Sequence, residues 1–164
     1  MKQPASSLRK ITSLPALLAA ARRAKARGRT VVFTNGCFDL LHAGHVRLLE
    51  RAKRLGDLLV VGINSDRSVR RLKGSGRPIV AQRDRARLLA ALACVDCVTI
   101  FDDPTPQRLI ERLRPDVLIK GTDWGFSEIV GSDIVRRHGG RVVRIPLLRG
   151  YSTTTLLERI KQRG

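Results

Sequence analysis

The sequence has no long apolar run and little that resembles a targeting segment. No stretch approaches the roughly 20 consecutive apolar residues that a membrane-spanning helix needs, so we expect no membrane partner. The apolar stretch 14–21 contains Pro15 and is followed by basic residues where a signal peptide would have its cleavage site. We interpret it as an amphipathic surface helix, and the 164 residues as one domain's worth of chain.

Cysteines are few. The three in the chain, Cys37, Cys94 and Cys97, are too few and odd in number for a disulfide framework, which favours a reducing cytoplasm. Cys94 and Cys97 have the spacing of a redox or half-zinc motif, but no second pair accompanies them. We interpret both as structural residues and expect a cytoplasmic protein.

Acidic and aromatic side chains are scarce as well. Asp and Glu number 14 against 32 Lys and Arg, a formal net charge of +18, and the basic residues are spread along the whole chain. This charge predicts a general preference for anionic ligands. Four Phe, one Tyr and one Trp are too few for a base-stacking platform, so we expect no nucleic-acid partner. A nucleic-acid-binding protein is the competing class, and it predicts salt-dependent binding to unrelated oligonucleotides.

Five apolar runs rich in β-branched residues alternate with helical stretches. Such strands, separated by helices, are typical of a parallel sheet covered on both faces. The predicted fold class is therefore α/β, a Rossmann-like, doubly wound, five-stranded parallel sheet. The strands are expected over 31–35, 58–64, 97–101, 116–120 and 141–145, and the main helices over 14–27, 43–55, 82–93 and 127–138, with two more opening at Thr105-Pro106 and at 152–154.

In such a sheet, ligands bind beyond the carboxyl ends of the strands, where the strand order reverses. The segment after the first strand lacks both standard phosphate motifs, the P-loop and G-x-G-x-x-G, which argues against a P-loop kinase or a dehydrogenase. It carries His42 and His45 instead, three residues apart at a helix start, with Gly44 between them. The two imidazoles share a face where free N–H groups favour an anion. We interpret them as phosphate contacts; metal ligands and ordinary polar residues are the alternatives.

The run TNGCFDLLHAGH at 34–45 resembles the signature of the HxGH nucleotidyltransferases, a superfamily of cytidylyltransferase-like α/β enzymes. Other segments resemble the heptose 1-phosphate adenylyltransferases in particular: NSDRSVRRLKGSGRP, QR at 82–83, CVDCVTIF, DDPTPQRLIERLRPDVLIKGTDW and STT at 152–154. The similarity implies a nucleotidyltransferase domain over 30–164, with a helical extension over 1–29 packed on it. It also implies the stand-alone form of an enzyme that several relatives carry fused to a sugar kinase.

The resemblance implies a reaction. The adenylyl group of ATP would pass to D-glycero-β-D-manno-heptose 1-phosphate, giving ADP-heptose and pyrophosphate, with Mg²⁺ as cofactor. The acceptor phosphate is already an anion, so positioning and charge neutralisation would provide most of the catalysis. A homo-oligomer, dimer or tetramer, is expected. The alternative is a CTP-dependent cytidylyltransferase acting on another small phosphate such as glycerol 3-phosphate.

The resemblance also implies roles for individual residues. The catalytic group is His42, His45 and Lys73. The nucleotide-binding group is Thr34, Asn35, Gly36, Cys37, Phe38, Asp39, Gly44, Lys120, Gly121, Asp123, Ser152, Thr153 and Thr154. The substrate-binding group is Asn64, Asp66, Arg83 and Trp124, although Ala81 replaces the glutamate common before the arginine.

Three of these assignments have alternatives, and one carries an electrostatic expectation. Asp39 could hold a metal or simply its own turn, Asp66 could be a surface cap, and residues 152–154 could be a plain helix N-cap. We expect both histidines to gain positive charge only with nucleotide bound, because the helix N-terminus disfavours imidazolium in the empty site.

Overall fold

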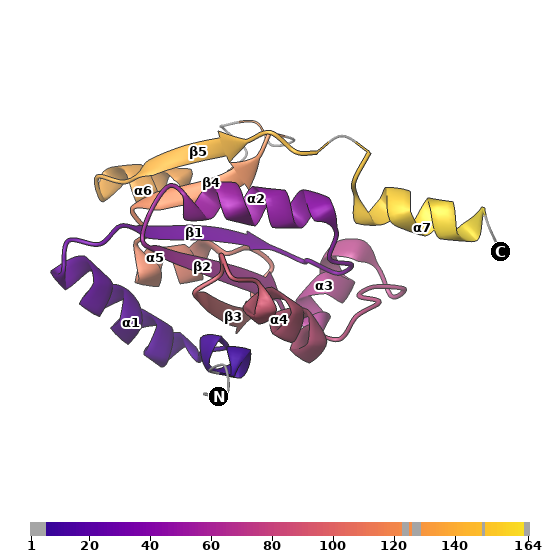
Figure 1. The fold of residues 1–164 in the computed structure, drawn as a ribbon, viewed down its shortest axis with the longest axis horizontal. Helices are drawn as coiled ribbons and strands as arrows, with labels where there is room; N and C mark the ends of the chain where they lie inside the picture. Colours follow the sequence, from indigo (N-terminus) through magenta and orange to yellow (C-terminus); the bar gives the residue numbers. More distant parts are fainter. Residues whose placement is uncertain (1–5, 123–124, 126–128, 149, 163–164) are drawn as a thin grey trace, which may run out of the picture.

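Five parallel strands form one sheet through the centre of the molecule (Figure 1). The computed structural model describes residues 6–122, 125, 129–148 and 150–162. The strands are β1 (Val31–Gly36), β2 (Leu58–Asn64), β3 (Cys97–Phe101), β4 (Val117–Gly121) and β5 (Arg141–Ile145). They lie within one residue of their predicted ranges, because each is a short apolar run that is buried between helices.

The strand order is β3-β2-β1-β4-β5, and every neighbouring pair is parallel. The chain builds outward from β1 to β3 and then returns to the other side of β1 to add β4 and β5. The predicted doubly wound sheet is thus confirmed. Its order reverses between β1 and β4, so the crevice that binds ligands in this architecture lies at the carboxyl ends of these two strands.

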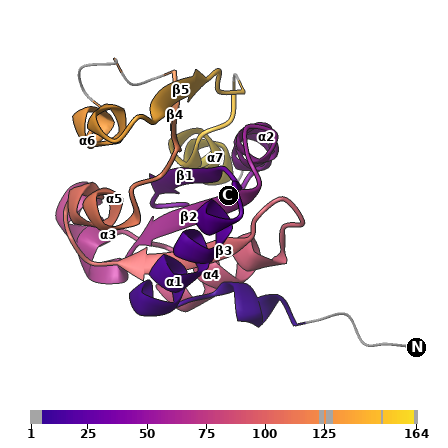
Figure 2. The ribbon, with the colours of Figure 1, turned by 90° about the vertical axis from the view of Figure 1, so that its left-hand side faces the viewer.

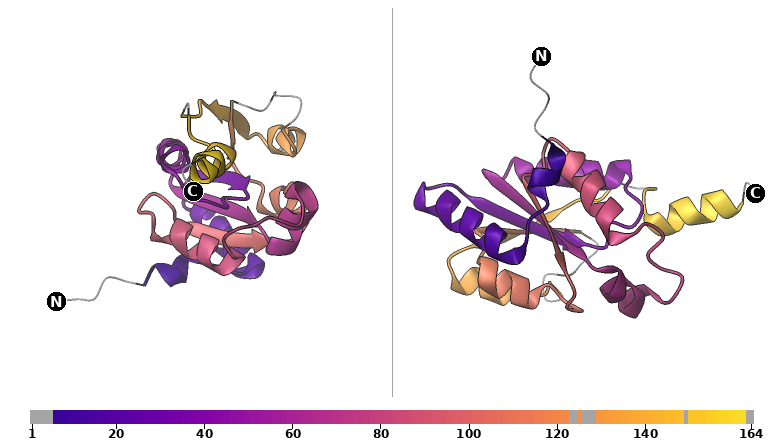
Figure 3. Two further views of the ribbon diagram at one scale, coloured as in Figure 1. Left: turned by 90° about the vertical axis from the view of Figure 1, so that its right-hand side faces the viewer. Right: turned by 90° about the horizontal axis from the view of Figure 1, so that it is seen from below.

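Helices cover both faces of the sheet (Figure 2). On one face α2 (Ala43–Lys53) and α4 (Gln82–Ala91) share a buried apolar cluster with the strands, and on the other face α1 (Leu14–Ala26), α5 (Gln107–Leu113) and α6 (Ser132–Arg137) share a second one. The remaining helices are η1 (Ser7–Lys10), α3 (Asp66–Lys73) and α7 (Thr153–Lys161). The last of these extends away from the sheet (Figures 1 and 3) and buries none of its residues in the described structure.

The N-terminal segment packs on the domain through α1. Leu17 and Ala21 are buried against the sheet, and Lys25 pairs with Asp116 at 2.9 Å. Ahead of the helix, the amide of Thr12 donates to the carbonyl of Val98 at 2.8 Å. The division of the chain at residue 29 stays a prediction.

Two helices begin later than their sequence patterns predicted. The helix expected to open with Thr105 as its cap starts at Gln107, with Pro106 in the N-cap position. The helix expected over 127–138 starts at Ser132, because Gly131 has φ 84°, a left-handed conformation that interrupts the helix there. Every helix in the described part of the chain is too short or too polar to cross a bilayer.

Candidate active site

A pair of stacked histidines lies at the start of α2, in the crevice where the strand order reverses. His42 is the N-cap residue of α2, with an extended backbone, and its carbonyl accepts from the amide of His45 at 2.9 Å. The helical turn therefore brings the two rings together: their centroids are 3.7 Å apart and their planes differ by 20°. The sequence spacing predicted a shared face, and the structure brings the rings into contact.

Both imidazoles are set up to be neutral in the ligand-free protein. Burial lowers the pKa of His42, and burial together with the neighbouring charge of His42 lowers the pKa of His45 to about 4. The expected low pKa is thus present, but its main cause is loss of hydration, whereas we had attributed it to the helix N-terminus. The Nδ1 atoms of both rings are buried and accept or donate no hydrogen bond within the described residues. They are free to bind a ligand.

The loop from β1 to α2 holds His45 from below. Phe38 has φ 47°, an uncommon left-handed value for a bulky residue, and its ring lies 5.0 Å from that of His45. A Cβ atom on Gly36 would lie 3.2 Å from the ring of Phe38. A side chain at position 36 would therefore push Phe38 against the histidine.

The start of α7 meets the start of α2. A Cβ atom on Gly44 would lie 3.0 Å from the ring of His42 and 3.2 Å from the Cβ of Tyr151. The rings of His42 and Tyr151 are 6.3 Å apart. Two helix N-termini, each able to attract an anion, therefore lie on either side of the histidine pair.

The hydroxyls of the 152–154 segment belong to the second helix start. The Oγ of Ser152 accepts from the amide of Thr155 at 3.0 Å, so the alternative N-cap role is realised. Thr153 is half-buried and Thr154 is exposed. A cap residue can still give a hydroxyl to a bound phosphate, so the predicted nucleotide role of this segment is compatible with the observed one.

Polar residues at the ends of β1 and β4 join the two strands across the crevice. The Nζ of Lys120 donates to Oδ1 of Asn35 at 2.7 Å, and the hydroxyl of Thr34 donates to the carbonyl of Ile119 at 3.2 Å. Gly121 is buried at the end of β4. Three of the predicted nucleotide residues thus shape the floor of the crevice.

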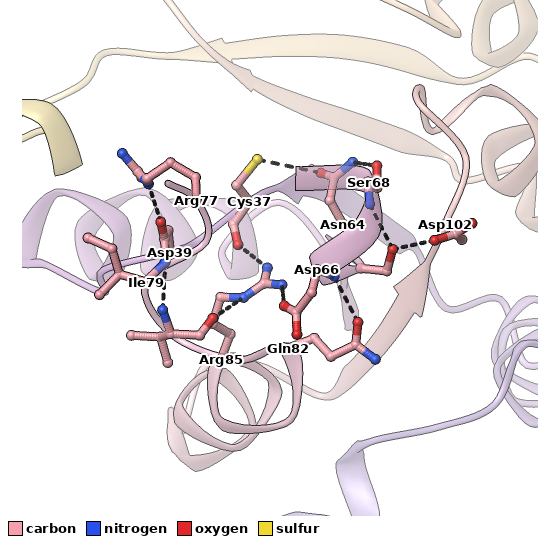
Figure 4. Close-up of polar contacts among 12 residues, drawn as sticks. Cys37, Asp39, Asn64, Asp66, Ser68, Arg77, Ile79, Gln82, Arg85 and Asp102 are labelled. Carbon is pink, nitrogen blue, oxygen red and sulfur yellow. Dashed lines mark hydrogen bonds and ion pairs between the residues drawn. The ribbon is translucent and has the colours of Figure 1, made fainter. Parts of the chain in front are cut away.

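Asp39 anchors a loop. Its Oδ1 accepts from the amides of Ile79 and Val80 at 2.8 and 3.0 Å, and its Oδ2 accepts from Nε of Arg77 (Figure 4). Burial alone would raise the pKa of this carboxyl, but the hydrogen bonds from Val80, Arg77 and Ile79 outweigh it and lower the pKa. Of the two roles left open by the sequence, holding the turn is the one that these contacts support.

A buried arginine that the sequence reasoning missed connects the loops of the site (Figure 4). The side chain of Arg85 is fully buried, and it donates to the carbonyls of Cys37 at 2.5 Å and Val80 at 2.9 Å and to Oδ1 of Asp66 at 2.7 Å. Arg83, the arginine predicted to contact substrate, is instead exposed on α4. The alternation along Gln82–Ala91 was the available signal, because residues 85, 86, 89 and 90 form the buried stripe of the helix.

The predicted substrate residues at the end of β2 separate into two environments. Asn64 is buried; its Nδ2 donates to the hydroxyl of Ser68 at 3.0 Å, and its Oδ1 lies 3.9 Å from the Sγ of Cys37. Asp66 pairs with Arg85 and also lines a cavity of about 530 Å³ together with Ser65, Gln82 and Asp102. Asn64 is therefore part of the scaffold, whereas Asp66 has a side open to a ligand.

Lys73 lies at the last turn of α3 and is exposed. Burial raises the pKa of the Cys37 thiol, and the positive charges of Lys73 and Arg85 act against that rise. This places the ammonium of Lys73 within electrostatic range of the loop after β1. Asp123 and Trp124 lie outside the described residues.

Comparison with known proteins identifies the family. The model of the family described as cytidylyltransferase-like matches residues 33–158. The chain belongs to this cytidylyltransferase-like family. It is 55% identical over 158 residues to the bifunctional protein HldE of Syntrophotalea carbinolica, a match that covers 96% of this chain and 32% of that protein. The chain thus spans about a third of the length of the curated relatives it matches.

Solved structures agree with this membership. The lipopolysaccharide core biosynthesis protein from Thermoplasma volcanium superposes with a TM-score of 0.64 at 30% identity, over 74% of this chain and 99% of that one. A pantoate–β-alanine ligase from Francisella tularensis, at 14% identity and a TM-score of 0.65 over 91% of this chain and 72% of that one, shows the same fold. The predictions of the HxGH superfamily, of a nucleotidyltransferase and of a Rossmann-like sheet are confirmed.

Proposed function

We propose that the chain transfers the adenylyl group of ATP to D-glycero-β-D-manno-heptose 1-phosphate, giving ADP-heptose and pyrophosphate. The observation that carries the proposal is the stacked pair of His42 and His45, with unpartnered buried nitrogens, at the start of α2. Family membership and the high identity to proteins named bifunctional protein HldE support the choice of reaction. Nothing in the comparisons favours the CTP-dependent alternative.

The chemistry needs few groups from the protein. An oxygen of the acceptor phosphate attacks the α-phosphorus of ATP, the bond from that phosphorus to the bridging oxygen breaks, and pyrophosphate leaves. Because the nucleophile is already an anion, no strong base is required, and donors placed around the phosphates supply the catalysis. The imidazoles, the first-turn amides of α2 and α7 and the ammonium of Lys73 are donors of this kind.

The low histidine pKa values fit a site that becomes charged only when it is occupied. In the ligand-free protein an imidazolium at position 45 would be poorly hydrated and close to His42, so the neutral form prevails. A bound triphosphate supplies negative charge beside the rings and favours protonation. Charge then develops on the histidines in step with binding, where it stabilises the transition state and the leaving pyrophosphate.

Mg²⁺ fits this site as part of the substrate Mg·ATP. The described residues contain no cluster of three or more His, Cys, Asp or Glu side chains able to hold an ion, and both oxygens of Asp39 are engaged by protein donors. Mg²⁺ commonly keeps several water ligands and binds through substrate phosphates. We therefore assign no resident metal to the protein.

Two further expectations accompany the proposed reaction. The three cysteines are free thiols, as expected for a protein of the cytoplasm, where ATP is available. We also propose a dimer or tetramer. Light scattering coupled to size-exclusion chromatography at working concentration tests the assembly, and a monomeric mass would contradict it.

The nucleotide preference is tested by pyrophosphate release with heptose 1-phosphate and each of ATP, CTP, GTP and UTP in turn. The proposal predicts that ATP has the highest kcat/KM. A higher value with CTP, or turnover of glycerol 3-phosphate in place of the heptose, would establish the alternative.

A further inference from the structure

A basic groove runs along α2 away from the histidine pair. It is a cavity of about 580 Å³, within the range of small-molecule sites, lined by Arg47, Arg51 and Arg54, together with Ala43, Val46, Glu50 and Leu148. Leu148 belongs to the connection between β5 and α7, so the groove lies between that connection and α2 (Figure 1). We refer to this cavity as the arginine groove.

The arginine groove begins beside the candidate active site. Residues 47, 51 and 54 follow the i, i+4, i+7 spacing and so share one face of α2. Side chains on a helix lean toward its N-terminus, so the guanidinium of Arg47 extends over Ala43, the first residue of the helix and the neighbour of His42. Arg51 in turn extends toward Arg47. The groove therefore presents positive charge in a row that leads from the start of α2.

These three arginines have no counter-charge of their own. Within the described part of the chain none of them forms a side-chain hydrogen bond or ion pair, and Arg51 is half-buried all the same. Glu50 is the one acidic residue of the lining, and no ion pair joins it to the arginines. Three guanidinium groups against one carboxylate leave the groove positive, so a small multivalent anion is the ligand that it fits.

We propose that the arginine groove binds the terminal phosphates of ATP before transfer and inorganic pyrophosphate after it. The inference rests on the proposed function, because that reaction places a triphosphate at the start of α2. Guanidinium groups bind phosphate oxygens through paired N–H donors, and Arg47 is the residue best placed to do so. AMP, which lacks the β and γ phosphates, would not extend into the groove.

The test compares two double variants of the whole chain. One is Arg47→Gln with Arg51→Gln, in the groove; the matched control is Arg22→Gln with Arg23→Gln, two exposed arginines on α1 at the opposite face of the sheet. Both remove two positive charges from a helix and both use a residue of similar helix propensity. Isothermal titration calorimetry measures the affinity of each protein for inorganic pyrophosphate and for AMP.

We expect the groove variant to bind pyrophosphate about tenfold or more weakly than the native chain, as loss of a charge-assisted hydrogen bond predicts. AMP affinity should be unchanged, and the control variant should match the native chain for both ligands. Equal losses in the two variants would reduce the effect to net charge, and a native-like groove variant would overturn the proposal. Failure of the native chain to use heptose 1-phosphate, with pyrophosphate still bound in the groove, would reject the acceptor and leave the groove assignment standing.

Discussion

The imidazole rings of His42 and His45 stack face to face, with their centroids 3.7 Å apart. Two positive charges at this distance would repel strongly, so the pair carries at most one proton in the ligand-free protein near neutral pH. The contact turns two ordinary side chains into one unit whose charge state responds to what is bound beside it. The proposed mechanism depends on this response.

Binding of a nucleotide should raise the pKa of His45 from its low value of about 4. The triphosphate brings negative charge next to the ring, which stabilises the imidazolium. Titration of the histidine side-chain resonances by NMR, with and without a non-hydrolysable ATP analogue, measures the shift. Unchanged values for both site histidines, with His138 as an exposed reference, would refute the coupling.

Stability should depend on pH through the same residue. The pKa of His45 falls from an ordinary 6.5 to about 4 on folding, so between these values the unfolded chain holds the proton that the folded one lacks. The contribution is complete above pH 6.5 and is lost as the pH falls toward 4. Thermal unfolding of the native chain and of His45→Gln tests this, and the variant should show a flatter dependence in that window. Parallel curves would contradict the burial account.

Gly44→Ala should damage activity more than stability. The new Cβ would lie 3.0 Å from the ring of His42, which must move out of its stack, whereas replacing a helical glycine gains at most about 1 kcal/mol of helix propensity. We expect kcat/KM to fall about tenfold or more with an almost unchanged Tm, in line with the cost of displacing a catalytic group. Gly76→Ala is the control, since a Cβ there meets nothing within 4 Å. Native activity in Gly44→Ala would show that the stacked geometry is dispensable.

Arg85→Gln should destabilise the fold, and Arg83→Gln should not. Loss of the buried guanidinium leaves the carbonyls of Cys37 and Val80 without their donor and Asp66 without its partner, at a cost of about 3 kcal/mol. The neighbouring arginine on the same helix is exposed. Urea unfolding of the two variants separates them. Equal midpoints would mean that Arg85 does not hold the loops.

Much of the architecture could be predicted from local signals. Each strand is a short apolar run ending in a polar segment, and five such runs with helices between them favour one sheet topology. Helix starts were harder. Thr105 before Pro106 has the form of a cap, yet α5 begins only at Gln107, because boundary signals act over one turn and tertiary packing decides between them.

The site divided along the same line. His42, Gly44 and His45 were predictable because their roles follow from a three-residue spacing on one helix. The anchoring contacts of Asp39 and Arg85 were not, because each joins segments about 40 residues or more apart in the chain. A carboxylate that holds a loop and one that holds a metal have the same sequence, and only their hydrogen-bond partners distinguish them.

The central claim is that the histidine pair serves adenylyl transfer to a heptose phosphate. The most direct measurement is pyrophosphate release from Mg·ATP and D-glycero-β-D-manno-heptose 1-phosphate by the native chain and by His45→Ala. We predict turnover in the native protein and a kcat lower by about 10²-fold or more in the variant, the usual cost of removing one preorganised donor. Absence of native turnover while ATP still binds would contradict the acceptor, and a variant as active as the native chain would contradict the role of the histidines.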